Sequence, residues 1–244
     1  MTQTSGIIVI GDEILSGMVQ DSNSLFMVRE LRQIGIDVRH ISVIRDDVAD
    51  IAKEVGELSG RFDYIFTSGG IGPTHDDVTI EGVARAFGLK PAIDGCLRSF
   101  IERRFGKDLT PEQLRMAEVP EGAEVIEDDS IGLPLIHFKN IYILPGIPEY
   151  LREKFILIAK LLFNRRPPLL RKVYIAEYET RLAPVLNEIV KNNKEIKIGS
   201  YPAVNRQDYQ VMVTLESYDE HALNSALQNL LGGIPVEKII KVEG

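Results

Sequence analysis

The sequence predicts a three-layer α/β/α domain with a mostly parallel sheet, followed by a small α+β domain. In the first ninety residues, short apolar runs alternate with amphipathic segments of ten to thirteen residues, which is the pattern of repeated βαβ units. A charged segment with two prolines at 165–168 then interrupts the chain and is the best candidate for a linker. Strand and helix patterns are mixed after it. We therefore expect one domain over 1–166 and a second over 169–244.

The elements of the first domain follow from apolar periodicity and from glycines that end each segment. The run 7–10 is apolar throughout and ends at Gly11, which is typical of a short buried strand. Between 22 and 34, apolar residues recur at helical spacing, and Gly35 ends the helix. The same reasoning places further strands at 36–44 and 64–67 and further helices at 48–58 and 78–87.

The pattern is less regular after residue 90. Residues 91–118 have a helical pattern that Gly106 and Pro111 break. Short strands and one long helix complete the first domain, and alternating strands and helices make up the second. The expected strands are 124–127, 135–138, 141–144, 173–177, 196–201, 210–215 and 236–242, and the expected helices are 149–163, 182–191 and 220–231.

The composition excludes several classes of protein. The chain has 244 residues with 36 Asp and Glu against 28 Lys and Arg, a net charge of −8, which argues against a nucleic-acid interface. Its best membrane candidate, 155–163, contains Lys160 and is far shorter than the ~18 residues that a span needs. The N-terminus lacks the basic and apolar regions of a signal peptide, and the single cysteine, Cys96, cannot form an intrachain disulfide. We therefore expect a soluble cytoplasmic protein with no membrane and no nucleic-acid partner.

Three loops follow the first three expected strands and carry the polar residues of interest. They are 11–23, 45–47 and 68–77. In an open parallel sheet, such loops lie together at the carboxyl ends of the strands, where ligands bind. The sequence therefore predicts one binding site built from all three loops.

The third loop is rich in glycine. Gly69, Gly70 and Gly72 would let backbone N–H groups approach a ligand closely. The helix expected at 78–87 begins just after them, and its N-terminus favours a phosphate. No Gly-Lys-Ser/Thr follows, so this is not a Walker A loop. The alternative interpretation is a tight connection between a strand and a helix.

The same loops also carry carboxylates. They are Asp12, Glu13, Asp46, Asp47, Asp76, Asp77 and Glu81. Carboxylates crowded at one edge repel one another unless a proton or a cation intervenes. Mg²⁺ in proteins typically uses one or two carboxylates together with substrate phosphates. We therefore hypothesise metal-assisted chemistry on a phosphoanhydride, in which the metal polarises phosphate and orients or activates water.

Each of these residues has an alternative role that needs no ligand. Thr74 to Asp77 resembles a capping box before the helix at 78–87, and Asp21, Asp46 and Asp47 stand where helix caps are expected. His75 could be a general base or a solvated loop side chain. Arg45 and Arg115 could contact a phosphate or form surface salt bridges.

The motifs together resemble a known family. Gly11-Asp12-Glu13-Ile14-Leu15-x-Gly17, Asp21-Ser22-Asn23 and the run from Ser68 to Thr79 are similar to the molybdenum-cofactor-biosynthesis (molybdopterin-binding-like) domain. Within that superfamily the chain resembles competence/damage-inducible protein A and the N-terminal half of eukaryotic FAD synthase. Leu144-Pro145-Gly146-Ile147-Pro148-Glu149 and the tail around 198–215 carry the resemblance to the end of the chain.

The resemblance implies a three-layer α/β domain with a nucleotide or pterin pocket, in a homo-oligomer that is a dimer or a trimer. It implies pyrophosphate hydrolysis of FAD or ADP-ribose with a divalent metal (Mg²⁺, Mn²⁺ or Co²⁺), with or without a monovalent cation. Adenylyl transfer to molybdopterin and non-catalytic binding of a pterin or nucleotide are the alternatives. The implied catalytic residues are Asp76, Asp77 and Asp46, and the implied metal ligands are Asp76, Asp77 and Glu13. The implied substrate-binding residues are Gly11, Asp12, Glu13, Asn23, Ser68, Gly69, Gly70, Gly72 and Thr74.

Two departures from the family pattern limit what the resemblance implies. Competence/damage-inducible protein A commonly carries Asn-Pro-x-Gly near the site, where this chain has Asp129-Ser130-Ile131-Gly132. The chain also has no room for a nicotinamide-nucleotide amidase domain or for the synthase half of FAD synthase. We therefore expect neither deamidation nor FAD synthesis from it.

Overall fold

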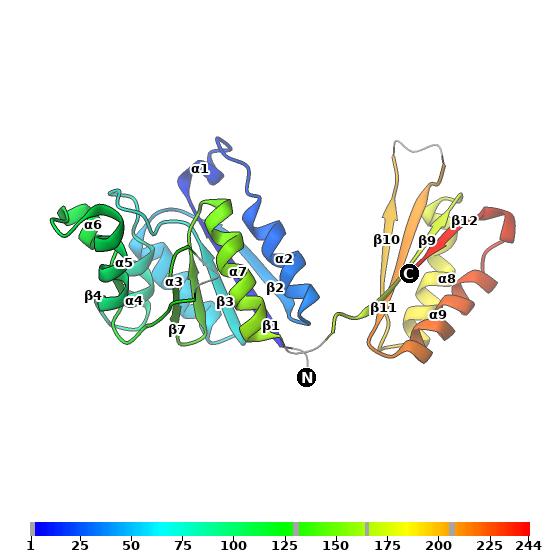
Figure 1. The fold of residues 1–244 in the computed structure, drawn as a ribbon. Coiled ribbons are helices and arrows are strands. Elements are labelled where there is room, and N and C mark those ends of the chain that lie inside the picture. Colours follow the sequence, from blue (N-terminus) through cyan, green and yellow to red (C-terminus); the bar gives the residue numbers. More distant parts are fainter. Residues whose placement is uncertain (1–2, 129–131, 164–165, 205–207) are drawn as a thin grey trace. The chain divides into compact units, whose positions relative to one another are not determined.

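A computed structural model describes residues 3–128, 132–163, 166–204 and 208–244. The chain divides into two compact units, Met1–Arg166 and Pro167–Gly244, which are described one at a time (Figure 1). The segment Asp129–Ile131, where the family pattern has its Asn-Pro motif, lies outside the described residues, as does Arg165 of the expected linker.

A six-stranded sheet forms the centre of the first unit. Its order is β2-β1-β3-β8-β7-β6. The strands are β1 (Thr4–Ile10), β2 (Asp37–Ile44), β3 (Tyr64–Ser68), β8 (Ile141–Leu144), β7 (Leu135–Phe138) and β6 (Glu124–Ile126). The first four are parallel to one another, and β7 pairs antiparallel with both β8 and β6. The expectation of a mostly parallel sheet is confirmed.

Helices cover both faces of this sheet, which gives three layers (Figure 1). On one face, α2 (Asn23–Gln33) and α7 (Pro148–Leu162) pack on a core that includes Ile7 and Phe66. On the other face lie α3 (Val48–Ser59), α4 (Thr79–Ala86) and α5 (Gly95–Phe105). Because both faces of the sheet are covered, the central strands β1 and β8 are buried at nearly every position rather than at alternate ones.

The structure corrects the broken helix expected at 91–118. This segment begins and ends in the three-residue strands β4 (Pro91–Ile93) and β5 (Glu118–Pro120), which pair antiparallel. Between them lie α5 and the short helix α6 (Pro111–Arg115), which starts with a capping box from Thr110. Strands of three residues are too short to show a period of two, so their sequence does not reveal them. A four-residue helix, α1 (Asp12–Leu15), also stands within the first expected loop.

The second unit is a four-stranded antiparallel sheet in the order β10-β11-β9-β12, with two helices packed against it. Its elements are β9 (Leu169–Ile175), α8 (Glu179–Asn192), β10 (Lys197–Pro202), β11 (Val211–Ser217), α9 (Glu220–Gly232) and β12 (Ile239–Glu243). In β11 buried residues alternate with half-buried ones, as one covered face requires. The strand expected at 236–242 begins later, because Val236–Lys238 form a 3₁₀ turn after Pro235.

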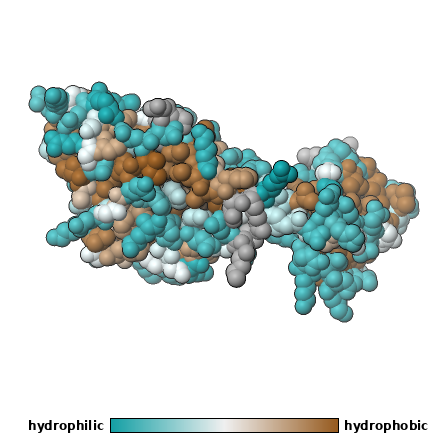
Figure 2. All heavy atoms as spheres, turned by 60° about the horizontal axis from the view of Figure 1, so that its bottom comes forward, coloured by the Kyte–Doolittle hydropathy of each residue, from teal (hydrophilic) through white to brown (hydrophobic). Residues whose placement is uncertain are grey.

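The surface of the first unit is not uniformly polar. Figure 2 shows hydrophobic side chains gathered in a continuous band on one face of it. In the described part of the chain, no helix has the length and apolar character needed to cross a bilayer.

Candidate active site

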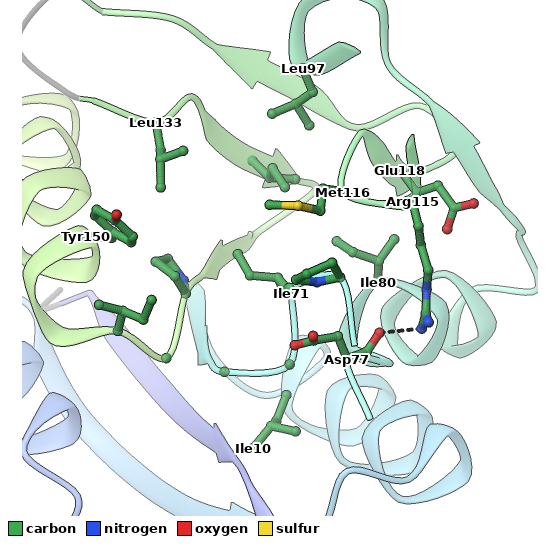
Figure 3. Close-up of a pocket in the computed structure, with 18 of the residues that line it drawn as sticks. Ile10, Ile71, Asp77, Ile80, Leu97, Arg115, Met116, Glu118, Leu133 and Tyr150 are labelled. Carbon is green, nitrogen blue, oxygen red and sulfur yellow. Dashed lines mark hydrogen bonds between the residues drawn. The ribbon is translucent and has the colours of Figure 1, made fainter. Parts of the chain in front are cut away.

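A cavity of about 710 Å³ opens at the carboxyl ends of β1, β3 and β8 (Figure 3). This volume lies within the range of small-molecule and cofactor sites. Glycines and carboxylates of the loops after β1, β2 and β3 line one side of it, and apolar side chains line the other. The three loops that the sequence predicts to lie together therefore do so.

The turn between β3 and α4 forms the floor of the cavity. Gly69 has a φ of +110°, and a Cβ atom there would overlap the carbonyl oxygen of Ile10 at the end of β1. Its N–H donates to the carbonyl of Leu144 at the end of β8 (3.1 Å), and its carbonyl accepts from the Thr79 hydroxyl (2.8 Å). Only glycine fits this position, which is bonded to the end of β8 and to the first residue of α4 and lies directly against the end of β1.

The carboxylate of Asp77 closes the second half of the same loop. Its Oδ2 accepts from the Thr74 backbone N–H (2.8 Å) and from the Thr74 hydroxyl (2.6 Å). The capping-box interpretation is wrong in one respect, because α4 begins at Thr79 after Val78 and receives no side-chain cap. Asp77 and Thr74 shape the loop rather than the helix end.

Arg115 holds this loop in place through two hydrogen bonds. It lies at the end of α6, and its guanidinium donates to the carbonyl oxygens of Thr74 (3.1 Å) and Asp77 (2.6 Å), as Figure 3 shows for Asp77. Arg115 also lines the cavity, so the phosphate contact that the sequence suggested for it stays a prediction. Arg45, by contrast, forms the expected surface pair with Asp50 at 2.7 Å.

Six of the described carboxylates line the cavity. They are Glu13, Asp46, Asp76, Asp77, Glu81 and Glu118. Burial raises the pKa of Asp46, and the negative charges of Glu13, Asp12 and Asp76 raise it further, while a hydrogen bond from the Asp12 N–H (2.8 Å) acts in the opposite direction. The pKa of the exposed Asp76 is lowered by hydrogen bonds from the Thr74 hydroxyl and from its own backbone. The crowding of negative charge expected at this edge is therefore present around Asp46.

In the part of the chain that the structure describes, the carboxylates do not form an all-protein cage for a metal ion. Within the described ranges, no three His, Cys, Asp or Glu side chains converge as ligands of one ion. One or two carboxylates are enough where substrate phosphates complete the shell of a Mg²⁺ ion. Asp46, half-buried among like charges, is the side chain whose surroundings a cation would relieve most. The residues present fit a cation held in that mode.

The opposite wall is apolar, and sequence patterns did not predict it. Its main side chains are Leu97, Phe100, Ile101, Phe105, Met116 and Ile136. Four of these come from α5, whose N-terminus is capped by the Asp94 carboxylate on the Leu97 N–H (2.9 Å). A planar aromatic ring would bury its faces against such a surface. The cavity therefore combines a polar floor with an apolar wall.

Five of the predicted binding residues stand outside the cavity lining: Gly11, Asp12, Asn23, Ser68 and Thr74. Asn23 is only 8 % exposed. Its side-chain amide donates to the Gly146 carbonyl (2.7 Å) and to the Ser68 hydroxyl (3.0 Å), so it ties the start of α2 to the loops after β3 and β8. Asn23 thus positions the loops that bound the cavity.

The remaining candidates have local roles. Asp47 caps α3, as expected, by accepting from Ala49 and Asp50, and Asp21 accepts from the backbone N–H groups of Asn23 and Ser24 at the start of α2. The His75 side chain is 99 % exposed and does not line the cavity. Burial and a hydrogen bond with Glu127 raise the pKa of Cys96 to about 11, so this thiol is not activated.

Comparison with known proteins accounts for both units. Residues 6–170 match the family model described as "Probable molybdopterin binding domain", and residues 167–243 match "FAD synthase, middle domain". A "Probable FAD synthase" of Caenorhabditis elegans is 30 % identical over 95 % of this chain and 50 % of its own length. A protein of Archaeoglobus fulgidus is 32 % identical over 91 % of this chain and 94 % of its own length.

The chain spans about half the length of the FAD synthase relatives it matches. Among solved structures, the protein CinA of Thermoplasma acidophilum, described as having unknown function, is 31 % identical and covers 66 % of this chain and 98 % of its own with a TM-score of 0.61. The family resemblance of the sequence motifs is confirmed. Residues 167–243 are similar to the middle domain of FAD synthase. The glycine turn, the surrounding carboxylates and the matched residues 6–170 together show that this chain belongs to the probable molybdopterin-binding domain family.

Proposed function

We propose that this chain is a divalent-metal-dependent nucleotide pyrophosphatase that hydrolyses FAD or ADP-ribose-like dinucleotides. The observation that carries the proposal is the cavity in which a glycine turn and the carboxylates of the neighbouring loops face an apolar wall. FAD and ADP-ribose each combine a charged diphosphate, which suits the polar side, with a flat aromatic ring, which suits the apolar side. The similarity of both units to FAD synthase relatives supports a flavin or adenine nucleotide over other phosphate esters.

The glycine turn and the carboxylates have separate roles in the proposed reaction. Gly69 and Gly70 expose the backbone of the β3–α4 turn to the diphosphate, which no side chain then obstructs. One or two of Glu13, Asp76 and Asp77 would hold the metal together with phosphate oxygens of the substrate. When bound, the metal would supply charge neutralisation of the phosphates and acidification of a water. Asp46 is the carboxylate best suited to take the proton of the attacking water, because its raised pKa makes it the stronger base.

The reaction balances without a further reactant. A water oxygen bonds to one phosphorus atom as the bridging P–O bond breaks, and the water proton passes to Asp46 and then to solvent. FAD and water give FMN and AMP, and ADP-ribose and water give AMP and ribose 5-phosphate.

Incubation of the pure protein with FAD, ADP-ribose and NADH tests the proposal directly. Each is combined with Mg²⁺, Mn²⁺ or Co²⁺, and nucleoside monophosphates are separated by chromatography. We expect AMP from at least one pair and none in EDTA. A folded sample that releases no monophosphate from any pair would refute the proposal.

A matched pair of variants assigns the carboxylates. We expect Asp76→Asn to abolish turnover with an unchanged melting temperature, because Asp76 is exposed and carries no part of the core. Asp208→Asn removes a charge of the same kind from an exposed position in the second unit and should leave turnover unchanged. Full turnover in Asp76→Asn would remove that residue from the mechanism.

The name of the matched family favours a second candidate, adenylyl transfer to a pterin in the same cavity. That reaction would consume ATP only when molybdopterin is present and would release pyrophosphate. A non-catalytic sensor would bind nucleotide or pterin without turnover. The resemblance also implies a dimer or a trimer, which analytical ultracentrifugation of the pure protein tests.

A further inference from the structure

One charged side chain of the cavity has no role in the chemistry above. Lys154 stands in α7, lines the cavity, and is only 3 % exposed. Its ammonium donates to the carbonyl oxygen of Pro134, which is a neutral partner. In the described part of the chain no carboxylate contributes to its electrostatics.

The geometry of α7 directs Lys154 toward the ligand space. Ile147, Tyr150 and Lys154 all line the cavity, and their spacing of three and four residues puts them on one face of the helix (Figure 3 shows Tyr150 at this wall). That face begins at the first turn of a fifteen-residue helix, where the helix dipole favours an anion, although the same turn carries Glu149 and has Pro148 as its first residue. A helix end of positive potential and a buried ammonium thus bound the same side of the cavity.

An unpaired ammonium at this depth disfavours the folded state. Burial lowers the pKa of Lys154 to about 8, which reflects the loss of water around its charge. A buried charge of this kind becomes favourable when an opposite charge is brought to it. The other cations of the cavity do not serve in its place, because Arg115 is bonded to the Thr74–Asp77 loop and Arg104 is exposed beside Phe105.

We propose, on the basis of the proposed function, that Lys154 and the N-terminus of α7 form an anion subsite that binds one phosphate group of the ligand. This subsite lies on the wall formed by α7, whereas the carboxylates and the glycine turn belong to the loops after β1, β2 and β3. The ligand is therefore held by charge of opposite sign on two walls, directly by Lys154 and through a cation by the carboxylates. Lys154 is in this sense a positioning residue that selects phosphate-bearing ligands over uncharged nucleosides.

Binding of an uncleavable ligand isolates this role from catalysis. We would measure, by calorimetry in Mg²⁺, the affinity of the full chain for α,β-methylene-ADP and for adenosine, which has the same base and sugar without phosphate. Lys154→Met keeps the length of the side chain and removes the charge. Lys154→Arg restores a charge, and Lys160→Met removes a lysine from an exposed position of the same helix.

We expect Lys154→Met to weaken α,β-methylene-ADP at least tenfold, with adenosine unchanged and with a melting temperature equal to or above that of the wild type. Lys154→Arg should recover part of the affinity, and Lys160→Met should behave as wild type. An unchanged affinity for the diphosphate, or an equal loss for both ligands, would overturn the subsite.

A lowered melting temperature with normal diphosphate binding would also overturn it, by showing that Lys154 only ties α7 to Pro134. Turnover of FAD and ADP-ribose separates this outcome from the proposed function. A wild-type chain that binds the diphosphate but hydrolyses nothing refutes the pyrophosphatase and leaves the subsite standing. A wild-type chain that binds no diphosphate refutes both.

Discussion

Replacement of Asn23 by aspartate tests how the loops around the cavity are held. In the native chain the Asn23 amide nitrogen donates to the Gly146 carbonyl at 2.7 Å and to the Ser68 hydroxyl at 3.0 Å. Asn23→Asp preserves shape but replaces this donor with an acceptor. The Gly146 carbonyl then faces a second acceptor in a site that is only 8 % exposed to water.

The expected cost follows from these two bonds. A lost hydrogen bond to a buried partner that is left unsatisfied costs roughly 1–3 kcal/mol, so losing the Gly146 bond and weakening the Ser68 bond together should lower the free energy of unfolding by about 2–4 kcal/mol. For a unit of this size each kcal/mol lowers the melting temperature by roughly 2–4 °C. We therefore expect the transition of the first unit to fall by about 5–15 °C, while the second unit is unaffected.

Differential scanning calorimetry of the full chain at several pH values is the appropriate assay. Burial raises the pKa of a carboxyl group, and the introduced carboxyl group, once protonated, would again supply one donor. The deficit of Asn23→Asp should therefore shrink as the pH falls below about 5. Asn23→Ala, which loses the donors without adding charge, should show a deficit that does not vary with pH. The reasoning fails if the aspartate variant melts within about 1 °C of the wild type or if its deficit is the same at every pH.

Three further outcomes follow from contacts described above. Asp94→Ala removes the cap of α5 and should lower the free energy of unfolding by about 1 kcal/mol, whereas Asp94→Asn should be neutral; urea titration measures both. Gly69→Ala should cost at least about 3 kcal/mol, because a Cβ would overlap the Ile10 carbonyl at a positive φ, and soluble expression at wild-type melting temperature would contradict it. The pKa of Lys154 is about 8 in the folded chain against an ordinary 10.5, so between these pH values the unfolded chain binds more protons than the folded one. The free energy of unfolding should therefore rise by up to about 3 kcal/mol between about pH 8 and pH 10.5. Lys154→Met should lack that rise when urea unfolding is measured across this pH range.

The parts of the fold that the sequence predicts are those with long apolar runs and clear stops. The strands at 135–138 and 141–144 are made almost wholly of large apolar side chains, and the structure has them at those residues. The three-residue strands β4 and β5 escaped prediction, because each is defined by pairing with the other rather than by its own pattern. Their pairing depends on contacts between segments some twenty-five residues apart.

Some features of the candidate site could likewise be predicted from the sequence, and others could not. Glycines and carboxylates directly after parallel strands could be predicted to meet, because topology alone brings those strand ends together. Arg115 could not be placed, because its partners are backbone carbonyls almost forty residues away in the chain. Lys154, by contrast, could have been singled out from the sequence. It lies three residues after Leu151 and four before Ile158, on the stripe that α7 buries, where a lysine contradicts the amphipathic pattern.

The fastening of the β3–α4 turn has a thermodynamic consequence for recognition. Gly69 is bonded to Leu144 and Thr79, Thr79 is bonded to Gly70, and the loop beyond is held by Arg115, so the floor is already ordered before a ligand arrives. Because this turn does not have to be ordered when a ligand binds, binding avoids the entropy loss that ordering a mobile loop would cost. Differences in affinity between ligands should then arise from their contacts with the two walls, and amide hydrogen exchange in the turn should slow little when a ligand binds.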